Sequence, residues 1–130
     1  MKVLALDYGA ARTGVAVSDP TGTLARPLCV VERASSDDGL ARLARVIGEE
    51  GAERVVVGLP LTLRGEHGAQ AAETERFVAA LRAVVAVPVE TLDERFTTTL
   101  AERAAGGAAN APADARAAAH LLETYLARAR

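Results

Sequence analysis

The fold is decided by the stretch Lys2–Ser18, which reads KVLALDYGAARTGVAVS. Its two apolar runs predict strands at Lys2–Asp7 and Thr13–Ser18, joined by a turn around Gly9. A further apolar run at Ala25–Glu32 predicts a third strand. The connections between these runs are too short to hold crossover helices, so we expect the three strands to form an antiparallel meander.

The rest of the chain alternates helical and strand patterns. A helix is predicted to begin at Ser35–Asp38 and to end at Gly51. The continuous β-branched run at Val55–Leu59 is typical of a strand buried on both faces. The other expected elements are a helix at Ala69–Val85 with Phe77, Leu81 and Val84 inward, a strand at Val87–Leu92, a helix near Thr97–Ala105, a loose linker at Gly106–Asn110, and a last helix from Pro112 to about Ala127.

This order predicts an α/β fold in a single domain, residues 1–130. Its mixed five-stranded sheet combines a three-strand antiparallel meander with two parallel strands and carries helices on both faces. Half of the 130 residues are hydrophobic, but only 3% are aromatic. We therefore expect an aliphatic core and no aromatic platform for stacking bases.

The formal net charge of −2 argues against a protein that coats nucleic acid by bulk charge, although it allows a local basic patch. Of the 15 basic residues, 14 are arginines and one is Lys2. This bias suits phosphate binding, but it could equally be a genomic composition effect. The only cysteine, Cys29, is expected to be buried and cannot form an internal disulfide. We see neither a signal peptide nor an apolar run of about 20 residues, so we expect a cytoplasmic protein. As a separate expectation, the protein is a monomer or weak homodimer.

Four acidic residues carry most of the functional information. Asp7, and the pair Asp93 and Glu94, end predicted strands, whereas Asp114 lies in the first turn of the last helix. Converging carboxylates repel one another unless a cation lies between them, and their oxygens suit Mg²⁺ or Mn²⁺. The sequence therefore predicts a catalytic metal site formed by these residues.

Each of these positions also has a structural interpretation. Asp7 could cap the turn that follows it, and Thr97 or Thr98 could cap a helix. A carboxylate at Asp114 is favoured by the helix dipole. However, Asp114 shares one helical stripe with Ala118, Leu121 and Tyr125, which we expect to be the buried face. His120 lies off that stripe and is expected to be exposed.

Other polar residues are candidates for substrate binding. Arg12 and Arg95 follow the first and last predicted strands and could orient phosphates. Arg64 and His67 lie in a glycine-containing loop that could contact substrate or could be an ordinary solvated loop. Thr97 and Thr98 complete the expected substrate-binding set.

These motifs together resemble those of the YqgF (RuvX) family. The matching blocks cover nearly the whole chain in order, and they are Leu6–Gly9, Arg12–Ala16, Ser18-Asp19, Val56–Leu61, Asp93–Thr98, Asp114, Ala118-Ala119 and Leu122–Leu126. The resemblance implies an RNase H-like fold, shared with Holliday junction resolvases, and a role in 5′-end maturation of pre-16S ribosomal RNA. It also implies that Asp7, Asp114 and one acid of the Asp93-Glu94 pair are the active-site carboxylates.

The chain departs from the family pattern at two places. Lysines usually precede the last aspartate, but here that stretch is Asn110–Ala113. Either a phosphate contact is missing or Arg116 supplies it. Phe96 replaces a Leu or Ile, which is a neutral apolar exchange.

The favoured interpretation is a metal-dependent nuclease acting on structured RNA or branched DNA. A non-catalytic nucleic-acid-binding module with the same fold is an alternative. The first motif also resembles the phosphate loop of actin-like ATPases, but 130 residues leave no room for their second domain.

Overall fold

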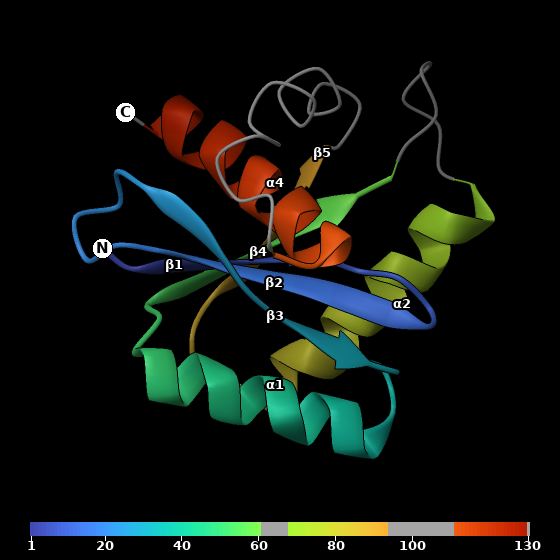
Figure 1. Ribbon diagram of the computed structural model, residues 1–130. Coiled ribbons are helices and arrows are strands. Elements are labelled where there is room, and N and C mark those ends of the chain that lie inside the picture. Colours follow the sequence, from blue (N-terminus) through green and yellow to red (C-terminus); the bar gives the residue numbers. More distant parts are fainter. Residues whose placement is uncertain (61–67, 94–110, 130) are drawn as a thin grey trace.

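The structure is a computed structural model that describes residues 1–60, 68–93 and 111–129. Figure 1 shows a central sheet with α4 on one face and with α1 and α2 on the other. The strands are β1 (Val3–Asp7), β2 (Arg12–Ser18), β3 (Ala25–Glu32), β4 (Arg54–Leu59) and β5 (Val89–Asp93), and the helices are α1 (Asp37–Glu50), α2 (Ala69–Arg82) and α4 (Ala113–Ala129).

The sheet has the order β3-β2-β1-β4-β5. β1, β2 and β3 pair antiparallel, whereas β4 pairs parallel with both β1 and β5. The predicted meander with two added parallel strands is therefore confirmed. The helix predicted near Thr97–Ala105 and the linker at Gly106–Asn110 lie outside the described residues.

Local sequence explains where α1 begins and ends. The Ser36 side chain accepts a hydrogen bond from the Gly39 N–H, which is the expected N-cap. At the other end Gly51 adopts φ +66°, a left-handed conformation that costs glycine little. Leu40, Leu43 and Ile47 are buried, as their spacing predicted.

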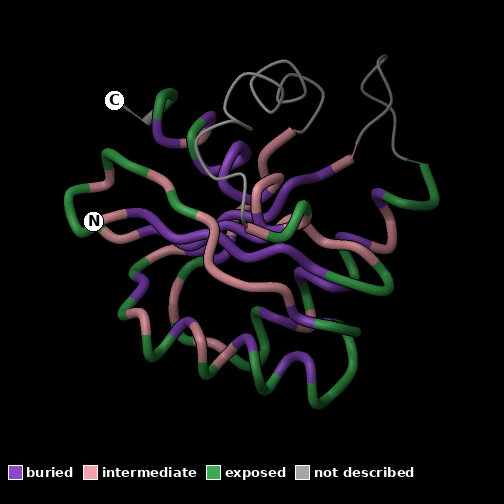
Figure 2. Tube along the Cα trace, in the orientation of Figure 1, coloured by how far each residue is buried: buried purple, intermediate pink, exposed green. Residues whose placement is uncertain are grey.

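Two apolar layers hold the helices on the sheet, and Figure 2 shows the buried residues along the central strands. One layer joins Leu4, Leu6 and Val57 to α1 and α2 through residues such as Leu43 and Phe77. The other layer joins Val3, Ala5, Ala16 and Val56 to Ala118, Ala119, Leu121, Leu122 and Leu126 of α4. Because alanine has a short side chain, the alanines in this second layer let α4 lie close to the sheet.

Three predictions of burial were wrong. Val84 is 47% exposed, because α2 ends at Arg82 and no longer directs the following residues inward. Cys29 is only partly buried, because β3 is an edge strand. His120 is buried at 5% exposure. It lies about 160° around α4 from the sheet-facing Leu122, so the side of α4 away from the sheet is covered there too.

Candidate active site

Asp7 lies at the carboxyl edge of the parallel strands, on the face covered by α4. It is the last residue of β1 and lies one position beyond the Leu6–Val57 pair with β4. Side chains alternate along a strand, and Val3 and Ala5 both pack against α4. Asp7 therefore faces α4, and its side chain is partly exposed.

Gly14 brings Asp114 beside Asp7. In the antiparallel ladder Asp7 pairs with Gly14, and directly opposite residues direct their side chains to the same face. A Cβ built on Gly14 would lie 1.8 Å from the main-chain oxygen of Asp114. The first turn of α4 thus rests on the position where Gly14 has no side chain. The structure places Asp7 and Asp114 on either side of one glycine, although they are distant in sequence.

Arg12 forms an ion pair with Asp114 at the same site. Its Nε lies 3.2 Å from Oδ2 of Asp114, with the two side chains 67% and 40% exposed. Such an exposed pair contributes little to stability, about 0–1 kcal/mol. The ion pair instead matters because it holds the Arg12 guanidinium next to the carboxylates.

The register of β5 separates the two acids that the sequence left as alternatives. Leu92 packs in the α4 layer, and Val89 packs in the layer of α1 and α2. Asp93 is paired with Leu59 and follows Leu92, so alternation directs its side chain to the α1 and α2 face. Asp93 and Asp7 therefore lie at the same edge of the sheet but on opposite faces.

The loop between β1 and β2 is held in place by contacts of Gly9 and of Tyr8. A Cβ on Gly9 would lie 2.5 Å from the main-chain oxygen of Arg12, so the turn closes only around glycine. The Gly9 N–H donates to Oγ1 of Thr13 at 3.4 Å. Tyr8 stacks on Phe77 of α2 with ring centroids 4.4 Å apart, and its hydroxyl donates to Glu73. Burial, more than the neighbouring Glu73 carboxylate, raises the pKa of Tyr8, so this phenol stays protonated at neutral pH.

Several predicted site residues lie outside the described residues, namely Glu94, Arg64, Arg95, Thr97 and Thr98, together with His67. Among the residues that are described, no group of three or more His, Cys, Asp or Glu side chains is arranged to hold a metal ion. Asp7 and Asp114 are thus the part of the predicted carboxylate set that the described structure brings together on one face.

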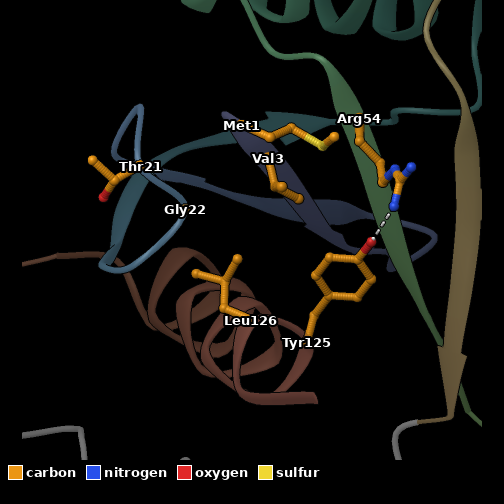
Figure 3. A pocket seen from close by; sticks show the side chains of 7 residues that line it. All are labelled: Met1, Val3, Thr21, Gly22, Arg54, Tyr125 and Leu126. Atoms are coloured by element: carbon orange, nitrogen blue, oxygen red, sulfur yellow. Dashed lines mark hydrogen bonds between the residues drawn. The ribbon is translucent and has the colours of Figure 1, made fainter. Parts of the chain in front are cut away.

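A cavity of about 340 Å³ lies away from these carboxylates, between the starts of β1 and β4 and the end of α4. Its lining is shown in Figure 3, where Tyr125 meets Arg54. Nη1 of Arg54 donates to the Tyr125 hydroxyl at 3.0 Å and lies 3.9 Å from Glu90. This contact ties α4 to β4 and β5, which is a structural role.

We expect Tyr125→Phe to destabilise the protein by about 1 kcal/mol, because it removes the acceptor for Arg54 Nη1. Thermal unfolding should show a melting temperature roughly 4 °C lower. The cleavage activity predicted from the sequence should be unchanged, because the contact lies at the other end of α4 from Asp114. An unchanged melting temperature, or a loss of activity, would contradict this role.

Nearly the whole chain matches a known family. The model of the family described as "RuvX: Holliday junction resolvase" matches residues 1–128. A Chloroflexus aggregans protein named "Putative pre-16S rRNA nuclease" is 45% identical over 130 residues, covering 95% of this chain and 92% of the relative.

Solved structures show the same fold at lower identity. RuvC of T. thermophilus, in complex with a Holliday junction substrate, aligns with a TM-score of 0.66 and 24% identity over 99% of this chain and 96% of that one. The fowlpox virus Holliday junction resolvase aligns with a TM-score of 0.61 and 9% identity over 100% of both chains. The predicted RNase H-like fold is confirmed. With the family model matching all but the last two residues, this chain belongs to the RuvX family.

Proposed function

We propose that this protein is a divalent-metal-dependent endonuclease that hydrolyses phosphodiester bonds in structured nucleic acid. The observation that carries the proposal is that Asp7 pairs with Gly14 while the main chain of Asp114 packs on Gly14, on one face of the sheet at its edge. The name of the 45% identical relative supports the precursor of 16S ribosomal RNA as substrate. Processing of its 5′ end in the cytoplasm is part of our proposal. The family description supports a Holliday junction as the second substrate to test.

The carboxylates present fit a hard cation such as Mg²⁺ or Mn²⁺. Carboxylates offer oxygen ligands, which such cations prefer. Asp114 already attracts one positive group in the described structure, the guanidinium of Arg12. Asp7, Asp114 and Glu94 would hold the ion; we choose Glu94 over Asp93 because Asp93 faces α1 and α2. When bound, such an ion lowers the pKa of a water and offsets charge on the phosphate.

Arg12 would bind a phosphate of the substrate. Its Nε lies near Asp114, the Arg12 side chain as a whole is 67% exposed, and the guanidinium has further N–H donors. An arginine fork can donate two parallel hydrogen bonds to a phosphate, which fixes the orientation of the group as well as binding it. The pair with Asp114 therefore pre-positions Arg12 for a phosphate at the carboxylates.

The choice between the two acids makes a prediction. Glu94→Gln should lower the cleavage rate on the order of 10³-fold, the effect of losing an active-site group, whereas Asp93→Asn should retain at least about a tenth of it. Calorimetric titration with Mn²⁺ should show weakened binding for Glu94→Gln only. The reverse ranking of the two variants would assign the ligand to Asp93.

The function is tested by cleavage of two substrates in parallel, a precursor 16S RNA fragment with its 5′ extension and a four-way DNA junction. We expect Mg²⁺- or Mn²⁺-dependent cleavage that EDTA abolishes, with the preferred substrate identifying RNA or DNA as the target. Binding without cleavage of either substrate, in the presence of metal, would instead support the non-catalytic binding module.

A further inference from the structure

Arg33 lies at the carboxyl edge of the sheet, next to the loop that follows Asp7. It comes directly after β3, whose end pairs Glu32 with Arg12. The Arg33 N–H donates to the main-chain oxygen of Ala11 at 3.0 Å, which extends the ladder by one residue. The main chain of Arg33 is therefore attached to the same loop that carries Arg12 into the candidate active site.

The backbone of Arg33 is strained and firmly held. Its φ is +45°, and no other described residue apart from glycine has a positive φ. Its carbonyl oxygen accepts hydrogen bonds from the Ser36 N–H at 3.0 Å and the Ser36 hydroxyl at 2.6 Å. Gly39 packs directly on it, since a Cβ there would lie 2.2 Å from that oxygen. Non-glycine residues in such conformations cluster at functional sites, where the side chain is retained despite the strain.

The side chain of Arg33 is exposed, and it forms no hydrogen bond or ion pair within the described structure. A glycine would suit this backbone better, so the arginine side chain needs a reason beyond folding. Arg12 on the neighbouring strand already carries a guanidinium at the same edge. Two such groups, one at the start of β2 and one just after the end of β3, could contact successive phosphates of one nucleic-acid strand.

We propose that Arg33 is a substrate-binding residue that contacts a nucleic-acid phosphate next to the one held at Arg12. This inference rests on the proposed nuclease function and extends its substrate contacts along the rim formed by β2 and β3. Arg33 stands outside the chemical step, so it should affect substrate affinity and KM while leaving kcat nearly unchanged.

The test measures binding of the precursor RNA fragment and of the four-way junction by fluorescence anisotropy, in Mg²⁺-containing buffer at several salt concentrations. For the wild type, few phosphate contacts predict a log–log salt slope of roughly −2 to −4. Arg33→Gln should weaken binding about three- to tenfold and make the slope shallower by about 0.7 to 0.9, the share of one phosphate. Arg33→Lys should recover most of the affinity.

Two further variants separate the side chain from the backbone. Arg33→Gly relieves the positive φ, so it should weaken binding like Arg33→Gln without lowering the melting temperature. Arg45→Gln, at an exposed position on α1, makes the same charge change and should leave binding unaltered. Equal affinity and slope for wild type and Arg33→Gln would overturn the assignment of Arg33 while leaving the nuclease proposal intact. A wild type that binds neither substrate would overturn both.

Discussion

Asp7→Asn is expected to abolish metal-dependent cleavage, with a loss on the order of 10³-fold or more in kcat. The amide is neutral, so it is a much weaker ligand for Mg²⁺ than the carboxylate. The fold should survive, because Asp7 ends β1 at a partly exposed edge and contributes nothing to the two apolar layers. With EDTA present the melting temperature should stay the same or rise slightly, since the change removes one of the two negative charges beside Gly14.

The matched control is Asp38→Asn, which makes the same change at an exposed position in the first turn of α1. Asp38 lies on the α1 side of the sheet, so its replacement should leave cleavage within about twofold and cost only the ~0.3–1 kcal/mol of a helix-dipole contact. A large fall in melting temperature for Asp7→Asn without metal would show that Asp7 is a structural cap, which was the alternative open from sequence.

Gly14→Ala should damage both stability and activity. The new Cβ would lie 1.8 Å from the Asp114 carbonyl oxygen, which is main chain and cannot rotate away. The start of α4 must therefore move, and we expect a loss of about 3 kcal/mol, near the upper end for overpacking. Displacing Asp114 relative to Asp7 by about 1 Å should reduce cleavage roughly 10²-fold in the fraction that remains folded.

Gly48→Ala in α1 is the control, because a Cβ at Gly48 meets nothing within 4 Å. Alanine is the better helix former by about 0.8–1 kcal/mol, so this variant should be more stable and fully active. Chemical denaturation measures both changes. If Gly14→Ala has wild-type stability and cleavage, the packing of α4 on Gly14 does not position the site.

Much of the fold could be predicted because it depends on local pattern. The short links between the first three strands permit only a meander, and the β-branched run at Val55–Val57 permits only a central strand, since it is buried on both faces. The start of α1 at Ser36 and its end at Gly51 follow from residues with strong preferences for those positions.

What could not be predicted depends on tertiary contacts. The face of the sheet toward which Asp93 points depends on how β5 is aligned with β4, and the sequence does not specify this register. His120 was predicted to be exposed because the helical spacing was interpreted with only one buried side of α4, whereas His120 is buried on another side. The role of Gly14 also depends on a tertiary contact, because only the folded chain places the main chain of Asp114 against it. Arg33 has an ordinary sequence context, and only its backbone conformation marks it.

The most direct test of the central claim is a crystal structure of the protein soaked in Mn²⁺, with anomalous scattering measured at the manganese edge. The account predicts a manganese peak bound by carboxylate oxygens of both Asp7 and Asp114, on the face of the sheet covered by α4. A peak elsewhere, or no peak at these carboxylates at a Mn²⁺ concentration that saturates cleavage, would contradict it.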